Sequence, residues 1–243
     1  MAKPSPHRRW LAALLWGASL ACAQDSTLTA HVVLLNVGKI SKPHQAGEAV
    51  LWLVPVGTPV APASPENPEA RPPQLIQRNK TFEPHLLVVP VGSVVEFPNR
   101  DPFFHNVFSL FEGKRFDLGL YEAGSTRKVR FDKPGISYIF CDIHPEMSAV
   151  IIALPTPYYG ISDSRGQVVM PNVPAGRYAL HVWYEDALPE QLNAMTREIE
   201  VSANTSTLGV IRLSAASLPL AHKNKYGQDY DPPTPDNPAY ERP

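Results

Sequence analysis

Short stretches in which hydrophobic and polar residues alternate recur through most of this 243-residue chain. The clearest is 177–185, where Tyr178, Leu180, Val182 and Tyr184 occupy every second position. Alternation with a period of two is typical of half-buried β-strands, whereas an amphipathic helix repeats every 3.6 residues. The chain also has 27 prolines and 14 glycines, a composition that disfavours long helices. The pattern therefore predicts an all-β fold.

Strands are expected where such stretches are bounded by glycine, proline or polar turn residues. They cover residues 27–35, 49–56, 86–91, 93–97, 105–111, 127–131, 137–141, 148–154, 177–185, 198–202 and 208–213. Between residues 74 and 156 they follow one another about every 8 to 12 residues, the spacing of a small sandwich or barrel. Residues 74–156 are therefore expected to form a domain of their own.

The segments on either side of this domain are each too short to fold alone. Residues 27–56 supply two strands, and an isolated hairpin is only marginally stable in water. We expect 27–56 and 158–213 to form one discontinuous sandwich, which the 74–156 domain interrupts or flanks. The proline-rich segment 57–73 is expected to be an extended linker, and 214–243 a mostly disordered tail.

The first 23 residues have the features of a signal peptide. Basic residues at positions 3, 8 and 9 precede the apolar stretch 10–21, and Ala21 and Ala23 stand where a signal peptidase requires small residues. The apolar stretch is shorter than the ~20 residues that a membrane-spanning helix needs. We expect cleavage before Gln24, export to the periplasm and no transmembrane segment in the mature chain. Lipoprotein anchoring at Cys22 is the less favoured alternative, because Ser19 stands where a large aliphatic residue is preferred.

Cleavage at that position leaves a single cysteine, Cys141. Structural cysteines of exported proteins normally occur in pairs, so a lone thiol requires another explanation. It is an inert core residue, a dimerising disulfide, a nucleophile or a metal ligand. The formal net charge of −1 offers no basis for a nucleic-acid partner.

The neighbours of Cys141 favour the metal ligand. His144 and Met147 follow it at intervals of three, in a loop between two expected strands. A thiolate, an imidazole and a thioether form a soft site that suits copper, and a second imidazole completes the ligand set of a blue-copper centre. His105, at the start of a strand, is the candidate. The alternatives are a buried thiol at Cys141, a histidine bonded to a turn at 105, and a core methionine at 147.

Residues 82–154 resemble the cupredoxins, which are Greek-key sandwiches. The resemblance is carried by Val91-Gly92-x-x-Val-x-Phe97, Asn99, His105-Asn106-Val107, Pro134-Gly135 and Tyr138-x-Phe-Cys141. The contracted loop Cys141-x-x-His144-x-x-Met147 is most similar to that of amicyanin. This resemblance implies one type 1 copper ion, with His105, Cys141 and His144 in the trigonal plane and Met147 as the long axial ligand.

The resemblance also implies roles for residues around the ligands. Asn106 would tie the first ligand's strand to the cysteine loop. Asp142 stands where relatives often have a hydroxyl-bearing residue, and its carboxylate would accept the bond from Asn106. Its negative charge near the copper should favour the oxidised state, so we expect Asp142→Thr to raise the reduction potential.

A cupredoxin site implies single-electron transfer and no catalysis. His-x-His pairs, a second mature cysteine and a Cys-x-x-Cys-His motif are all missing, which removes multicopper oxidase, binuclear copper and haem readings. His144 would be the electron port, and Pro102, Phe103, Phe104 and Pro145 an apolar patch for transient docking of an unknown redox partner. Copper delivery or storage, or a binding module with incidental copper, remains the alternative.

The discontinuous sandwich has a likeness of its own. Ala30-His-Val to Trp52, Asp163-x-x-Gly166 and Asn172-Val-Pro-Ala-Gly176-x-Tyr-x-Leu-x-Val182 are similar to carboxypeptidase regulatory-like domains, which are prealbumin-like modules. The whole arrangement resembles proteins labelled methylamine-utilisation proteins with a plastocyanin-like domain. The remaining histidines after residue 23 are expected to be ordinary surface or strand residues: His31, His44, His85, His181 and His222.

Overall fold

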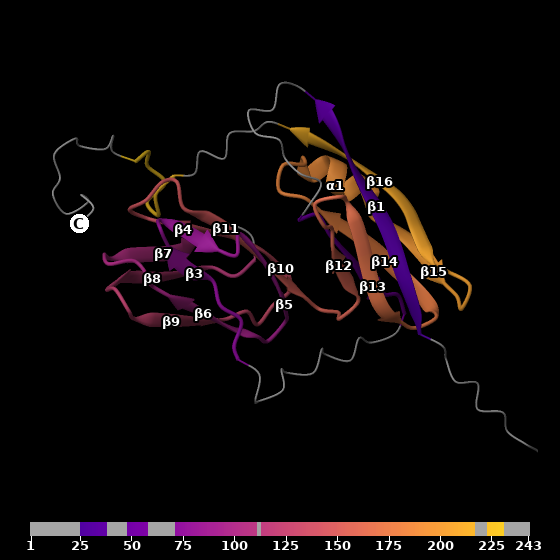
Figure 1. Ribbon diagram of the computed structural model, residues 1–243, viewed down its shortest axis with the longest axis horizontal. Helices are drawn as coiled ribbons and strands as arrows, with labels where there is room; N and C mark the ends of the chain where they lie inside the picture. Colours follow the sequence, from indigo (N-terminus) through magenta and orange to yellow (C-terminus); the bar gives the residue numbers. More distant parts are fainter. Residues whose placement is uncertain (1–24, 38–47, 58–70, 111–112, 217–222, 231–243) are drawn as a thin grey trace, which may run out of the picture.

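A computed structural model describes residues 25–37, 48–57, 71–110, 113–216 and 223–230. Within these ranges the chain forms sixteen β-strands and one short helix, so the prediction of an all-β fold is confirmed. The strands are arranged as two sandwiches side by side (Figure 1). The expected signal peptide and most of the expected linker lie outside the described residues.

The first sandwich is built from both ends of the chain, and we call it the split sandwich. Its strands are β1 (Ser26–Val37), β2 (Val50–Pro55), β12 (Tyr159–Ile161), β13 (Gln167–Val173), β14 (Gly176–Trp183), β15 (Arg197–Val201) and β16 (Thr207–Ala216). One sheet has the order β13-β1-β16 and the other β12-β2-β14-β15. The strands before residue 56 therefore pair with strands after residue 158, and β1 runs parallel to β16.

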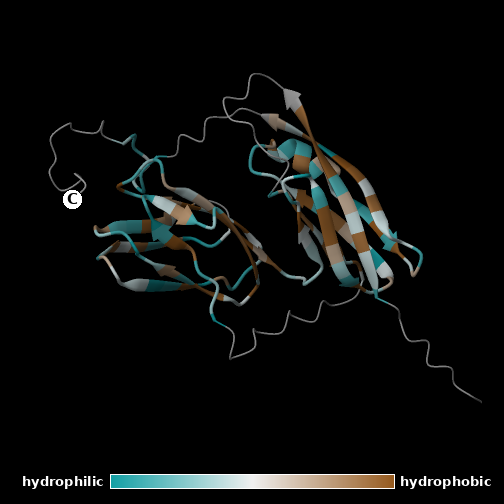
Figure 2. Ribbon diagram, in the orientation of Figure 1, coloured by the Kyte–Doolittle hydropathy of each residue, from teal (hydrophilic) through white to brown (hydrophobic). Residues whose placement is uncertain are grey.

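The core of the split sandwich follows from its alternating residues. Leu180 and Val182 are buried together with Leu51 and Leu53 of the paired strand β2, and Leu28 of the opposite sheet packs against them. Figure 2 shows the brown and pale bands that alternate along these strands. One face of each strand is therefore removed from water, which provides the main stabilising free energy of the unit.

The second sandwich, which we call the central sandwich, lies between the two halves of the first in sequence. Its strands are β3 (Ile76–Arg78), β4 (Thr81–Glu83), β5 (Leu86–Pro90), β6 (Val94–Pro98), β7 (His105–Ser109), β8 (Phe116–Tyr121), β9 (Thr126–Arg130), β10 (Gly135–Cys141) and β11 (Ser148–Leu154). A five-stranded sheet has the order β5-β11-β10-β7-β8. The pairs β6–β9 and β3–β4 complete the unit, and single bridges join residues 74 and 77 to 96 and 99.

Five strands and the helix were not expected from the sequence. The strands β3, β4 and β12 have three residues each, too few to show an alternation. Gly119 interrupts β8, and Pro171 interrupts β13, so neither reads as a continuous strand. The helix α1 (Pro189–Met195) has proline in its first turn and no buried residue, and it caps one end of the split sandwich beside β14.

The two sandwiches share a hydrophobic contact. Val50 and Trp183 of the split sandwich are buried against Val150, Ile152 and Leu154 of β11. At its edge, the His85 Nε2 atom lies 2.6 Å from a carboxylate oxygen of Glu185. The central sandwich is therefore packed against its neighbour through the face of β11 that points away from its own core.

Parts of the expected C-terminal tail have defined structure. Strand β16 continues to Ala216, three residues beyond the expected end. Residues 223–230 form a turn segment that contacts the central sandwich. Among the described residues no helix has the length and apolar character needed to cross a membrane.

Candidate metal centre

The loop that follows β10 holds Cys141, His144 and Met147. Because β10 and β11 pair up to Phe140 and Ser148, the residues between them form a tight connection. The Cys141 amide donates to the Met147 carbonyl at 3.3 Å, and the Met147 amide donates to the His144 carbonyl at 3.0 Å. These two bonds close the loop so that all three side chains are buried, while Pro145 and Glu146 are exposed.

His105 reaches this loop from the neighbouring strand. In the ladder between β10 and β7, Cys141 is paired with Val107. Side chains two apart on a strand share a face, so His105 lies on the same face of β7 as the partner of Cys141. The His105 imidazole is fully buried.

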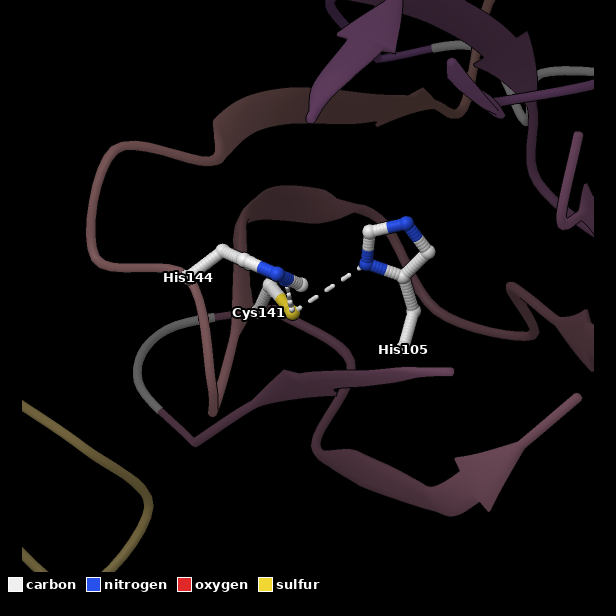
Figure 3. Close-up of side chains that lie close together, drawn as sticks. All are labelled: His105, Cys141 and His144. Carbon is white, nitrogen blue, oxygen red and sulfur yellow. Dashed lines mark hydrogen bonds between the residues drawn. The ribbon is translucent and has the colours of Figure 1, made fainter. Parts of the chain in front are cut away.

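The three side chains converge on one point. The Cys141 Sγ atom lies 3.6 Å from Nδ1 of His105 and 3.4 Å from Nδ1 of His144 (Figure 3). The ligand atoms of the three residues all lie within 4.8 Å of one another. Within the described ranges, these three residues form the one group of side chains that could hold a metal ion. The two imidazole rings are 4.8 Å apart between centroids.

A carboxylate that the sequence analysis missed orients His105. Asp101 Oδ2 lies 2.9 Å from His105 Nε2, and the Asp101 side chain is 5% exposed. The amides of Asn79 and Lys80 donate to the same carboxylate at 2.6 and 3.0 Å. Since an ionised carboxylate only accepts, His105 carries its proton on Nε2 and turns an unprotonated Nδ1 toward the sulfur.

Asn99, which belongs to the cupredoxin-like motif, shapes the turn that carries Asp101. Its side-chain amide donates to the Phe103 carbonyl at 2.7 Å, and its Oδ1 accepts the Asp101 amide at 3.0 Å. One indication of the role of Asp101 is present in the sequence: this residue stands four residues before the candidate ligand His105. Four residues within a turn do not indicate which way a side chain points.

Burial controls the protonation of the site. It raises the pKa of the Cys141 thiol, and it lowers the pKa of His105 despite the opposing influence of Asp101. Burial and the neighbouring His105 lower the pKa of His144 to about 4. In Asp101 burial opposes ionisation, but the bonds from Lys80, His105 and Asn79 outweigh it and lower the pKa. At neutral pH without metal, the site therefore holds two neutral imidazoles and a protonated thiol.

Met147 is fully buried in the same hydrophobic cluster as Cys141, Val107 and Tyr121. Its backbone is fixed by the two loop bonds described above. The sequence predicted Met147 as an axial ligand, and the structure places it in the loop and inside the core. Its ligand role stays a prediction.

The residues expected around the ligands make different bonds from those implied by the resemblance. The tie between β7 and the cysteine loop is formed by the backbone, where the Asp142 amide donates to the Asn106 carbonyl at 3.0 Å. The Asp142 carboxylate accepts instead from the backbone amide of Lys225, at 2.9 Å. Near Asn106, burial opposes ionisation of Asp117, but Gly119, Lys225 and Asn106 outweigh it and lower the pKa of that carboxyl.

The four apolar residues expected to form a docking patch lie at this end of the sandwich. Phe103 packs on both imidazoles, with centroids 5.3 Å from His105 and 5.5 Å from His144. Phe104 is 55% exposed, and Pro102 and Pro145 are exposed as well. Phe103 therefore covers the site, and Phe104 faces solvent.

The other described histidines take ordinary positions. His31 accepts from the Gln167 side chain, His85 bonds to Ser148 and Glu185, and His181 stacks on Trp52. His44 and His222 lie outside the described residues.

The two separations that start at the Cys141 sulfur are close to those expected around a metal ion, and the limit of 4.8 Å that covers all three ligand atoms is wider than a trigonal site requires. Typical metal bonds of ~2.0 Å to nitrogen and ~2.3 Å to sulfur, at a trigonal angle of ~120°, put the two ligand atoms about 3.7 Å apart. The observed values of 3.6 and 3.4 Å are close to this. Two imidazole nitrogens, a thiol and a nearby thioether are a donor set that suits copper.

Comparisons with known proteins place cupredoxins among the structural neighbours. No protein-family profile and no curated protein matches the sequence. The chain is similar to a purple cupredoxin from Nitrosopumilus maritimus, with 23% identity, a TM-score of 0.31, and coverage of 34% of this chain and 99% of that one. A mutant of amicyanin has 20% identity and a TM-score of 0.33, with coverage of 34% of this chain and 82% of that one. A copper-containing nitrite reductase from Thermus scotoductus has 24% identity and a TM-score of 0.34, with coverage of 50% of this chain and 28% of that one.

Proposed function

We propose that this chain is an exported type 1 copper protein that carries single electrons between redox partners. The observation that carries the proposal is the convergence of His105, Cys141 and His144 on one buried point. Met147, in the same closed loop, is proposed as the weak axial ligand. One copper ion held there would supply a one-electron couple between Cu(II) and Cu(I).

The chain's own residues support rapid electron exchange. The ligands come from a strand and a loop that are closed by backbone bonds, so we expect metal binding to move them little. Asp101 fixes the tautomer of His105 in advance. A preorganised site changes little between oxidation states, which keeps the reorganisation that accompanies electron transfer small.

Access for a partner is proposed at the end that carries Phe104, Pro102 and Pro145. His144 is 3% exposed, and it lies beneath this surface next to Phe103. An apolar patch of this kind suits a small and transient interface with a redox partner protein. We propose no catalytic role, because the ligands are buried and the proposed set uses every donor for the ion itself.

We also propose a periplasmic location and a supporting role for the split sandwich. The location rests on the signal-like N-terminal sequence. The resemblance of the split sandwich to carboxypeptidase regulatory-like domains, and the division of the chain at about residues 57, 74, 156 and 214, are likewise proposals.

The test is an absorption spectrum of the full chain after export in the presence of copper. We expect one equivalent of copper and intense visible absorption from the thiolate, with loss of that absorption in Cys141→Ser. His181→Gln is a matched control, because this histidine stacks on Trp52 in the split sandwich. A colourless protein that holds copper and releases it readily to a chelator would contradict electron transfer and favour copper delivery.

A further inference from the structure

Residues 223–230, which we call the strap, form an ordered turn far from the metal loop in sequence. Asn224 organises it: its side chain accepts the amides of Tyr226 and Gln228, each at 3.0 Å. Its backbone amide and carbonyl bond to Gln228 and Gly227 at 2.9 Å. An asparagine that bonds to amides two and four residues later fixes a tight turn, so the strap presents its side chains in defined directions.

The strap is bonded to the two residues at the start of the metal loop. The Lys225 amide donates to Asp142 Oδ1 at 2.9 Å. The Tyr230 hydroxyl donates to the carbonyl of Cys141 itself, also at 2.9 Å. Burial raises the pKa of the Tyr230 phenol, so this group remains a donor throughout the physiological range. One end of the strap therefore contacts the proposed thiolate ligand and the other its neighbour.

The Lys225 ammonium lies between two carboxylates. Its Nζ atom is 3.0 Å from Asp117 Oδ2 and 3.8 Å from Asp142 Oδ2. The Lys225 side chain is 19% exposed and that of Asp142 is 13% exposed. Charges that are this well covered are less screened by salt than a surface pair. Asp117 belongs to β8, which pairs with the ligand-bearing strand β7. The ammonium of Lys225 therefore connects strand β8 with the metal loop.

We propose that Lys225 and Tyr230 are positioning residues of the copper site. Lys225 neutralises the carboxylate next to Cys141, and Tyr230 holds the Cys141 carbonyl. The proposal rests on the proposed function, because it assumes that a redox-active ion is held by His105, Cys141 and His144. It explains why an acidic residue is accommodated beside the ligand: the strap supplies the opposite charge.

The expected redox effects have opposite signs. Removing the positive charge in Lys225→Gln stabilises the oxidised, more positive site and lowers the reduction potential. Removing the negative charge in Asp142→Asn raises it. Each change is expected to alter the ratio of oxidised to reduced protein at a fixed applied potential by about two- to tenfold. The double variant should return toward the wild type, and Lys225→Arg, which keeps the charge, should remain near it.

Lys114→Gln is the matched control. Lys114 Nζ is 2.9 Å from Asp132, in a lysine–aspartate ion pair that is more exposed than the pairs of Lys225. Asp132 lies just before the start of β10, whereas Cys141 is its last residue. Seven residues of strand span about 20 Å, which exceeds the Debye length of ~8 Å at physiological salt. The control should therefore leave the potential unchanged.

A second measurement needs no metal. In Tyr230→Phe the phenol loses only its hydroxyl, and the loop loses one hydrogen bond. Hydrogen exchange of the Cys141 and Asp142 amides in the metal-free protein should become about two- to tenfold faster. Amides of the split sandwich should exchange at unchanged rates.

The outcomes separate the two proposals. A wild-type protein without a reversible copper couple contradicts the proposed function. A wild type with that couple, in which Lys225→Gln behaves like Lys114→Gln, overturns the role of Lys225. Unchanged exchange in Tyr230→Phe overturns the role of Tyr230. A lowered potential in Lys225→Gln that is restored in Lys225→Arg supports the proposal.

Discussion

The two sandwiches bury different kinds of side chain. The core of the split sandwich is formed by aliphatic and tyrosine residues, and its buried polar side chains in the described ranges are the hydroxyls of Ser26 and Ser162. The central sandwich buries a carboxylate, two imidazoles and a thiol at one end, namely Asp101, His105, His144 and Cys141. Both units are β-sandwiches, but within the described residues the buried cluster of titratable groups lies in the central one.

The difference singles out the end of the central sandwich at which the candidate metal centre lies. Burying polar groups is unfavourable unless they are bonded, and a core of apolar residues would be more stable. The central sandwich tolerates its cluster because bonds to Asp101 and the closed metal loop compensate part of this cost. Among its described residues the split sandwich has no such cluster.

The largest expected effect is in the split sandwich. Leu180 is fully buried there. Leu180→Ala should reduce the free energy of unfolding by about 2–5 kcal/mol, through lost burial and a residual cavity. Denaturant unfolding measures the loss. The visible absorption of the folded, copper-loaded protein should remain unchanged, and a changed spectrum would mean that the two units are coupled through their shared contact.

The carboxylate behind the first ligand is expected to matter for metal binding. Asp101→Asn removes the charge that fixes the His105 tautomer, and copper affinity should fall by about 10- to 100-fold. Competition with a chelator measures it. Asp132→Asn, at the far end of β10, is the control and should bind copper like the wild type.

The buried imidazoles predict an acid-sensitive metal-free protein. In the unfolded chain His144 titrates near its ordinary pKa of 6.5, while burial lowers the pKa to about 4 in the folded protein. Between these values the unfolded chain binds a proton that the folded protein does not, so stability falls as the pH decreases from 6.5 to 4. The loss should amount to about 3 kcal/mol. Denaturant unfolding across this range should show a shallower pH dependence in His144→Gln, and equal slopes would contradict the prediction.

The smallest effect concerns the contact between the sandwiches. The hydrogen bond that His85 donates to the Glu185 carboxylate raises the pKa of His85, with burial opposing it. The protonated His85 therefore stabilises the folded protein fully below the unfolded pKa of 6.5, and this contribution is lost as the pH rises through the raised value. Because the His85 side chain is 38% exposed, Glu185→Gln should cost less than about 1 kcal/mol. Comparing unfolding of the variant and the wild type on both sides of that range measures it, and a pH-independent difference would rule out this origin.

Much of the fold was predictable because its signals are local. Clean alternation identified the strand at 177–185, a high content of Val and Leu identified those at 27–35 and 49–56, and apolar runs identified the two strands that flank the metal loop. The short strands β3, β4 and β12 and the interrupted strands β8 and β13 gave no such signal, since pairing with neighbours, and not the local pattern, holds them in place.

The candidate site was also partly visible in the sequence. Cys141, His144 and Met147 stand close together in the chain, so their spacing alone suggested a common role. His105 was chosen from among several histidines by its place at the start of a strand. Asp101 escaped notice because its bond to His105 depends on the path of a turn, which Asn99 determines.

The sequence by itself determined the β pattern and the concentration of soft ligands in one loop, because covalent spacing places nearby residues within reach of each other. Only the tertiary structure decided that His105 faces Cys141, that Asp101 orients it, and that the strap lies across Asp142 from 83 residues away. Contacts between distant segments depend on which strands pair and how loops close. Strand pairing and loop closure are stabilised by packing throughout the core, so no short stretch of sequence specifies them.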